Sequence, residues 1–147
     1  MVTKQKRKLT VRQKIEQFLS ESTDVAFIRK EFEPFGGYRQ VSRVLKQLID
    51  EGRLMRAGYG IFVKSYKAPS RAKSSYGEIR TYPKMDVVGV AFEVLPKLGY
   101  EVDVNSFEEK NLKGLCTQIA YAPMVRVKGR IRRKLALGYE ELLYEGN

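Results

Sequence analysis

Apolar residues recur at helical spacing between positions 38 and 51 of the chain. Five of them fall at i, i+3, i+4, i+7 and i+8, on one stripe of a helix: Val41, Val44, Leu45, Leu48 and Ile49. Gly37 precedes this stretch and Gly52 follows it, so a turn leads into the predicted helix and a glycine cap ends it. The side chains between the apolar ones are mainly cationic or polar, which predicts one buried and one solvent-facing side.

Shorter patterns precede this helix. Thr10 is a suitable N-cap for a helix reaching about residue 20, with Ile15 and Leu19 on its apolar face. The apolar run 25–28 fits either a strand or the start of the next helix, and 29–35 fits a short helix that ends before the glycines.

Two apolar runs, 54–56 and 61–63, follow the main helix. The segment between them, 57–60, contains two glycines that permit a tight turn, so the runs are expected to pair as a β-hairpin. The predicted order is two helices, a turn, the main helix and a hairpin. This is the order of a winged helix-turn-helix. That fold places a helix in the DNA major groove and a wing on the backbone, and we expect it over residues 1–66.

The second half of the chain has a different composition. Residues 67–83 are rich in Lys, Ser, Ala, Pro and Tyr with little apolar periodicity, which predicts a linker. A small α+β domain with a mostly antiparallel sheet is expected over 84–147. Its predicted elements are a helix and several strands, with the final segment either a strand or a helical turn: 84–98, 100–104, 117–121, 124–137 with a hinge at Gly129, and 139–144.

Charge narrows the class of partner. The 28 basic and 17 acidic residues give a net charge of +11, which favours binding to nucleic acid because association releases phosphate counterions. The surplus is +7 over residues 1–66 (14 basic, 7 acidic) and +4 over 67–147 (14 basic, 10 acidic). The first half is therefore the more cationic one, and it is also the shorter.

Residue types that are missing exclude most enzyme chemistry. The chain has no histidine and one cysteine, so Ser-His-Asp, Cys-His and His-containing zinc sites are impossible. The carboxylates Glu101, Asp103, Glu108 and Glu109 do not form a nuclease pattern, and Cys116 is expected to be a small buried apolar residue. We therefore expect no enzyme, no metal and no cofactor.

Cysteine usage and hydropathy predict the compartment. A single cysteine suits a reducing cytosol, and no apolar run approaches the roughly 20 residues of a membrane span. The basic start leads into an amphipathic helix rather than an apolar signal-peptide core. A cytoplasmic protein without membrane contact is expected.

The outer face of the predicted main helix carries the candidate DNA-reading residues. Arg39 and Arg43 are four residues apart and share a face, and Gln40 lies beside them. An arginine can form two hydrogen bonds with guanine, and a glutamine can form two with adenine. Neighbouring side chains are placed for phosphates, which fix register without reading sequence: Tyr38, Ser42 and Lys46.

Two further basic groups are candidates. Arg56 and Tyr59 flank the hairpin turn and would contact the DNA backbone. In the second half, four cations alternate with apolar residues and are expected on one strand face: Arg126, Lys128, Arg130 and Arg132. This face fits either a second DNA contact or an acidic partner protein, and the sequence does not separate the two.

Two segments resemble a known family. The stretch VSRVLKQLIDEGRLMRAGYGIF, with Arg56 and the Gly60-Ile61-Phe62 ending, is similar to the winged-helix domain of AbiEi-type antitoxins of type IV toxin–antitoxin systems. The segment Asn111 to Gln118 is similar to an Asn…Gly-Leu-Ser-Thr-Gln segment of the same relatives, with Cys116 in place of the serine. The resemblance implies an autoregulating repressor, linked through its operon to a nucleotidyltransferase-like toxin that it does not contact.

The leading hypothesis from the sequence is therefore a transcriptional repressor that binds double-stranded DNA sequence-specifically. It would be antitoxin-like and able to form a homodimer. The alternative is a protein-interaction adaptor that uses the winged helix and the basic strand to bind an acidic partner. Salt-sensitive duplex binding that is lost on substitution of Arg43 separates the two hypotheses.

Overall fold

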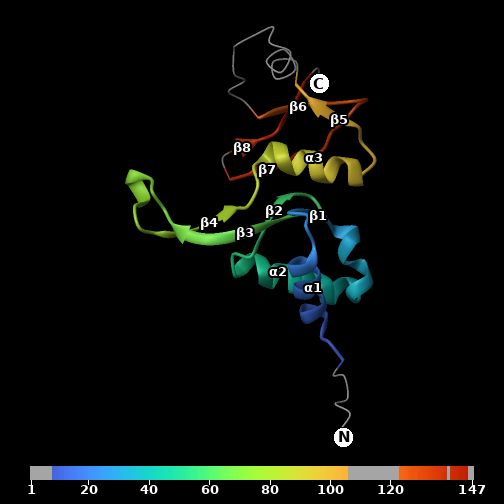
Figure 1. Cartoon of the computed structure of the whole chain (residues 1–147), viewed down its shortest axis with the longest axis vertical. Coiled ribbons are helices and arrows are strands. Elements are labelled where there is room, and N and C mark those ends of the chain that lie inside the picture. Colours follow the sequence, from blue (N-terminus) through green and yellow to red (C-terminus); the bar gives the residue numbers. More distant parts are fainter. Residues whose placement is uncertain (1–7, 106–122, 139, 146–147) are drawn as a thin grey trace, which may run out of the picture.

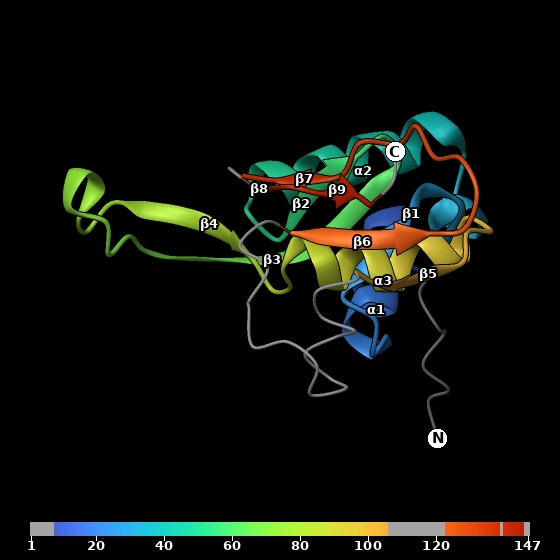
Figure 2. The same ribbon diagram turned by 90° about the horizontal axis from the view of Figure 1, so that it is seen from above.

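The computed structural model describes residues 8–105, 123–138 and 140–145. The structure is α+β with mostly antiparallel sheets, arranged in layers (Figure 1). Helices of the N-terminal part lie on one side of a four-stranded sheet, and α3 with the C-terminal strands lies on the other (Figures 1 and 2). The α+β class expected from the sequence is confirmed.

The N-terminal elements occur in the order that the apolar spacing predicts. They are α1 (Val11–Glu21), β1 (Ala26–Ile28), the 3-10 helix η1 (Arg29–Phe35), α2 (Tyr38–Asp50), β2 (Leu54–Gly58) and β3 (Ile61–Pro69). The ambiguous run 25–28 is a strand over its last three residues, Ala26–Ile28, all of which are buried. At α1, the Thr10 hydroxyl accepts a hydrogen bond from the Gln13 amide, and the Gln13 side chain accepts one from the Thr10 amide.

β3 is the central strand of the sheet. It pairs antiparallel with β1 through Ile28 and Ile61, with β2 through Arg56 and Phe62, and with β4 (Ile79–Pro83) farther along. The register of β2 shifts between Arg56 and Gly58, which is a β-bulge just before the hairpin turn. The long strand β3 therefore belongs to the layered body at one end and to a separate two-stranded ribbon at the other.

The first hydrophobic core lies between the N-terminal helices and the sheet. Ile15, Leu48 and Phe32 are fully buried in it. The Phe32 ring lies 5.9 Å from Phe62 in an edge-to-face arrangement, and Phe18 packs against Phe27 at 5.4 Å in the same way. This core holds α1, η1 and α2 on one face of the sheet.

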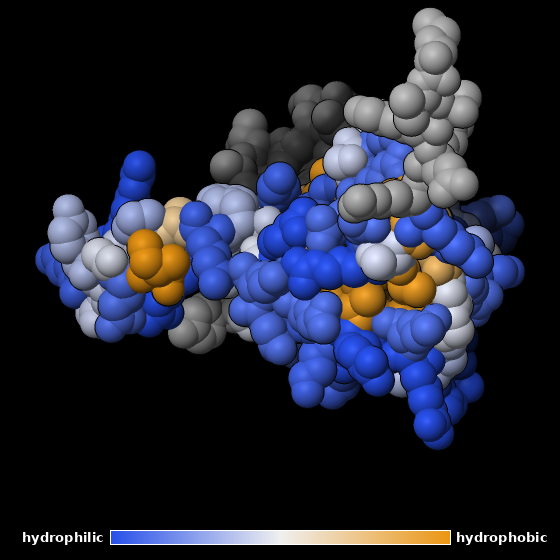
Figure 3. All heavy atoms as spheres, turned by 90° about the horizontal axis from the view of Figure 1, so that it is seen from below, coloured by the Kyte–Doolittle hydropathy of each residue, from blue (hydrophilic) through white to orange (hydrophobic). Residues whose placement is uncertain are grey.

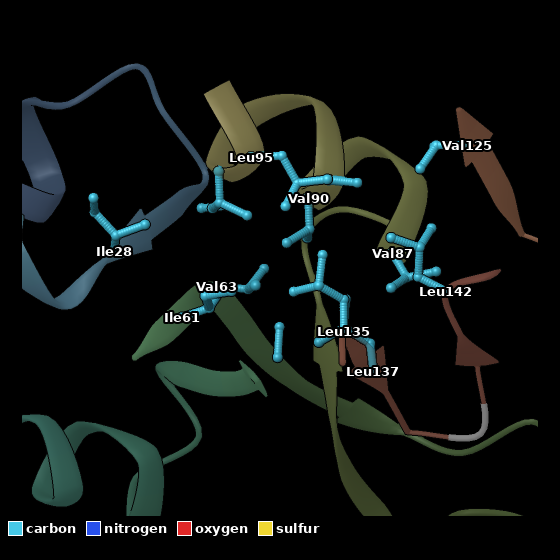
Figure 4. Close-up of a cluster of buried hydrophobic side chains, with 14 of the residues drawn as sticks. Ile28, Ile61, Val63, Val87, Val90, Leu95, Val125, Leu135, Leu137 and Leu142 are labelled. Carbon is cyan, nitrogen blue, oxygen red and sulfur yellow. The ribbon is translucent and has the colours of Figure 1, made fainter. Parts of the chain in front are cut away.

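The second core lies on the opposite face of the sheet (Figure 4). Helix α3 (Val87–Lys97) contributes Val90 and Leu95, which pack with Ile61 and Val63 of β3. C-terminal residues complete it: Val125, Ile131, Leu135, Leu137 and Leu142. The second core therefore contains residues from both predicted parts of the chain, 1–66 and 84–147.

The C-terminal strands are short. β5 (Val102–Val104) pairs antiparallel with β6 (Met124–Val127), β6 pairs parallel with β9 (Leu143–Tyr144), and β7 (Ala136–Leu137) pairs with β8 (Glu140–Glu141). The predicted tail 139–144 therefore contains strands, apart from Tyr139, which lies outside the described residues. The predicted strand 117–121 lies outside them as well.

Two expectations from the sequence are wrong. The predicted linker 67–83 is the end of β3, the short 3-10 helix η2 (Lys73–Ser75) and β4, and these elements form a ribbon. The predicted extent of the strands over 124–137 is wrong, because β6 ends at Val127 and the chain is irregular from there to β7. The predicted hinge at Gly129 is present, since this residue adopts a positive φ of 89°. Asp86 also starts α3 later than expected, since its Oδ1 accepts the Gly89 amide at 2.7 Å as an N-cap.

Candidate nucleic-acid interface

Helix α2 is fixed by its apolar stripe and presents the opposite side to solvent. Val41, Val44, Leu45 and Leu48 are buried in the first core. The side chains on the other side are exposed: Tyr38, Arg39, Gln40, Arg43, Lys46, Gln47 and Asp50. Seen from below, the face that carries α1 and α2 is predominantly hydrophilic (Figure 3). The amphipathic pattern therefore places five of the six predicted α2 residues on the surface, with Ser42 half-buried.

The cations of α2 have no acidic partner among the residues that the structure describes. In the described part of the chain, no carboxylate lies within 4.0 Å of the charged groups of Arg39, Arg43 or Lys46. Gln40 is more constrained, because its Oε1 accepts a hydrogen bond of 3.4 Å from the Gly37 amide at the start of the helix. A paired contact from Gln40 to adenine uses the same oxygen as an acceptor, so the cap and the base contact would share it.

Two cations near the ends of α1 and α2 are paired with carboxylates. Arg12 of α1 pairs with Glu51 at 2.6 Å and also with Glu16. These contacts raise the pKa of Arg12, the hydrogen bond to Glu51 most of all. Arg53 lies 3.5 Å from Glu16 on the same side of the molecule. The cations of α2 therefore differ from Arg12 and Arg53, whose charges are balanced by nearby glutamates.

Arg29 ties the start of α2 to the hairpin. Its backbone amide donates to the Gly60 carbonyl at 2.8 Å, and its Nη2 donates to the Tyr38 carbonyl at 2.9 Å. The guanidinium carbon also lies 4.6 Å from the centre of the Tyr38 ring. The first turn of α2 and the hairpin tip are thus held on one side of the molecule. Sequence reasoning missed this residue, although a basic residue directly after a buried strand was a visible signal.

The hairpin tip presents Tyr59, which is 88% exposed. Gly60 adopts a positive φ of 68°, which permits the tight turn, and Ile61 returns opposite Gly58. Arg56 is exposed on β2, and its guanidinium carbon lies 5.9 Å from the centre of the Phe62 ring. The two predicted hairpin residues are therefore accessible, with Tyr59 at the tip and Arg56 on the strand before it.

A C-terminal segment adds positive charge at this tip. Arg133 donates from Nη1 to the Tyr59 carbonyl at 3.2 Å. The Lys134 carbonyl lies so close to Gly58 that a Cβ built there would be 2.6 Å from it. Arg132 and Lys134, on either side of Arg133, are exposed. Segment 130–134, which also contains the exposed Arg130, thus lies beside the hairpin rather than on a remote strand.

The prediction that four cations share one strand face is wrong. Arg126 lies on β6 directly opposite Asp103 of β5, and their charged groups are 3.2 Å apart. Lys128 lies just beyond the strand, 3.5 Å from Glu101. Arg126 and Lys128 therefore belong to a patch of cross-strand ion pairs, whereas Arg130 and Arg132 follow the bend at Gly129.

Two of the four carboxylates considered as metal ligands take part in these ion pairs. Glu101 and Asp103 face Lys128 and Arg126, while Glu108, Glu109 and Cys116 lie outside the described residues. Over residues 8–105, 123–138 and 140–145, no group of three or more Asp, Glu, Cys or His side chains is arranged to hold a metal ion. None of the helices in these ranges combines the length and apolarity needed to cross a bilayer.

Comparisons of the chain with protein-family models, with curated proteins and with solved structures gave no match. The resemblance to AbiEi-type antitoxins stays a prediction from the sequence. Its second motif, Asn111 to Gln118, lies outside the described residues.

Proposed function

We propose that the N-terminal part of the chain is a winged helix that binds double-stranded DNA, with α2 as the recognition helix and the β2–β3 hairpin as the wing. The observation that carries this proposal is the set of exposed cations without acidic partners, within the described residues, on the outer side of α2. The element order α1-β1-η1-α2-β2-β3 supports it, because helices followed by a β-hairpin are the order expected for a winged helix-turn-helix.

We assign different tasks in DNA binding to different parts of this surface. Arg39 and Arg43 lie on the first half of α2, the part of a recognition helix that contacts base edges. Tyr59 and Arg56 of the wing, with Lys46 farther along α2, contact phosphates and fix the register of the helix in the groove. Arg130 and Arg132 extend the phosphate contact beside the wing, and Arg126 and Lys128 take no part because acidic groups already neutralise them.

The biological role we propose is transcriptional repression. A protein that occupies a specific duplex can repress transcription by blocking access to that duplex. The resemblance to AbiEi-type antitoxins suggests that this duplex lies upstream of the protein's own operon and that the operon also encodes a toxin. A homodimer would read two half-sites spaced by a helical turn or a multiple of it.

Fluorescence anisotropy with a labelled duplex from upstream of the gene, compared with a scrambled duplex, tests the proposal. We expect Arg43→Ala to lose discrimination between the two duplexes by about 1–3 kcal/mol, or roughly 5- to 150-fold. Arg126→Ala is the matched control, because it removes an arginine that is already paired with Asp103. Absence of duplex binding by the wild type at low salt would favour the protein-interaction adaptor instead.

A further inference from the structure

Residues 66–83 form a two-stranded ribbon, here called the arm, that projects from the layered body (Figures 1 and 2). The end of β3 pairs with β4 from Tyr66 opposite Tyr82 to Pro69 opposite Ile79. The turn between them contains η2 and is closed by a hydrogen bond of 2.7 Å between the Ser70 and Ser75 hydroxyls. The arm is therefore an ordered element with a defined register.

The arm is strongly cationic. It contains four basic residues and one acidic residue, Glu78, which lies 3.4 Å from Arg80. Its other cations have no carboxylate partner among the residues that the structure describes: Lys67, Arg71 and Lys73. Three positive charges are thus held away from the body on a narrow ribbon.

The side chains of the arm contribute little to either core. Tyr76 is 80% exposed and Ile79 is 64% exposed, and β4 has no fully buried residue. Tyr66, Tyr76, Tyr82 and Arg71 border an open hollow on the ribbon. A two-stranded ribbon gains little stability by itself, so this element is better explained by a partner than by packing.

The arm and the wing lie at opposite ends of β3, on either side of α2. At the C-terminal end of α2, a Cβ built on Gly52 would be 2.5 Å from Lys67 and 3.1 Å from Thr81, both at the base of the arm. The wing tip lies at the N-terminal end of α2, where Arg29 contacts both Gly60 and Tyr38. β3 has nine residues, which span roughly 30 Å at about 3.3 Å per residue, close to the ~34 Å of one DNA turn.

We propose that the arm is a second nucleic-acid contact, which grips the phosphate backbone of the duplex about one turn from the site of the wing. This inference rests on the proposed DNA binding of α2. Arg71 and Lys73 neutralise phosphates, and the hydroxyl of the exposed Tyr76 donates to backbone oxygens. A second copy of this chain fits the arm less well, because each copy carries a net charge of +11.

The test compares the wild type with Arg71→Ser/Lys73→Ser on duplexes of about 40 base pairs between about 50 and 200 mM salt. The matched control is Lys84→Ser/Lys128→Ser, which removes the same charge at exposed positions away from the tip of the arm. Loss of two phosphate contacts should weaken binding roughly ten- to a hundredfold and reduce the steepness of the salt dependence by about 1.8. The preference for the native over the scrambled duplex should remain.

A series of shortened duplexes adds a second readout. Shortening the duplex on the side that the arm reaches should lower the affinity of the wild type to that of the arm variant. The affinity of the arm variant should not change. Circular dichroism and urea unfolding of the arm variant should match the wild type, because both substituted side chains are exposed.

The outcomes separate the inference from the proposed function. An arm variant that binds like the control overturns the role of the arm and leaves α2 as the reader. An arm variant whose only defect is weaker self-association in sedimentation also overturns it, in favour of contact with a second copy. A wild type that binds no duplex overturns both. Loss of binding in the arm variant while Arg43→Ala keeps its sequence preference supports the arm and counts against α2.

Discussion

The ammonium group of Lys97 on α3 lies 3.0 Å from Glu31 Oε1 on η1. The same group lies 2.8 Å from Asp24 and donates to the Ala26 carbonyl at 2.9 Å, so one side chain joins three N-terminal segments to α3. Burial lowers the pKa of Lys97, but the hydrogen bonds to Asp24 and Glu31 outweigh it and the pKa is raised. Because the pKa of Lys97 is higher in the folded protein than its ordinary value of 10.5, the charged lysine stabilises the fold. This stabilisation is fully present at pH values below 10.5, which include neutral pH, and is lost as the pH rises through the folded-state pKa.

Replacing this lysine should therefore destabilise the protein. We expect Lys97→Met to lower the free energy of unfolding by about 1–3 kcal/mol, because two carboxylates and a carbonyl lose their partner. Urea unfolding at neutral pH measures the change. Lys84→Met is the control, since Lys84 is exposed and should change stability by less than about 0.5 kcal/mol. Equal stability of the two variants would contradict a linking role for Lys97.

The shared second core predicts that the chain unfolds as one unit. Leu95 of α3 is fully buried against residues from both halves, so Leu95→Ala should lower the free energy of unfolding by about 2–5 kcal/mol. Far-UV circular dichroism and tyrosine fluorescence should report the same single transition. Leu143→Ala, at a position 44% exposed, serves as the control. Two separate transitions would show that the halves are stable independently.

Acid should weaken the ion pair between Arg12 and Glu16 on α1. The hydrogen bond from Arg12 lowers the pKa of Glu16 below its ordinary value of 4.5, against the opposing effect of burial. This contribution is present above the unfolded-state pKa and is lost as the pH falls through the lower folded-state pKa. Between about pH 6 and about pH 3, the unfolding free energy of the wild type should fall more steeply than that of Glu16→Gln. Glu33→Gln, at an exposed position, should follow the wild type.

The contact between the hairpin and segment 130–134 can be tested at Gly58. A Cβ at this position would lie 2.6 Å from the Lys134 carbonyl, which is too close for a real contact. We expect Gly58→Ala to lower the free energy of unfolding by about 1–3 kcal/mol, because one backbone must move. Thermal or urea unfolding gives the value. An unchanged stability would mean that segment 130–134 can withdraw from the hairpin without cost.

The sequence predicted best the elements that bury one face. The apolar stripe from Val41 to Leu48 predicted α2 with nearly correct limits. The glycines at positions 58 and 60 predicted the turn of the β2–β3 hairpin. The arm was missed for the same physical reason. β4 buries no face, so its alternation leaves no hydrophobic pattern, and its backbone hydrogen bonds to β3 cannot be read from residue types.

The basic cluster of the second half shows a different limit. In the sequence, apolar residues alternate with cations from Val125 through Val127 to Ile131. In the structure, a positive φ at Gly129 turns the chain, so Ile131 lies in an irregular segment and is buried there. The pairing of Arg126 with Asp103 depends on a cross-strand register between segments far apart in the sequence. Local periodicity identifies which residues are basic or apolar, and only the tertiary fold decides which of them remain unpaired.

β3 runs unbroken from the hairpin tip into the arm, so two surfaces share one strand. Successive side chains of a strand face opposite sides, and deletion of one residue between Val63 and Lys67 would turn the arm over relative to the body. A change of two residues would keep the same facing and move the arm by only about 7 Å. We therefore expect this strand to tolerate insertion or deletion of two residues better than insertion or deletion of one.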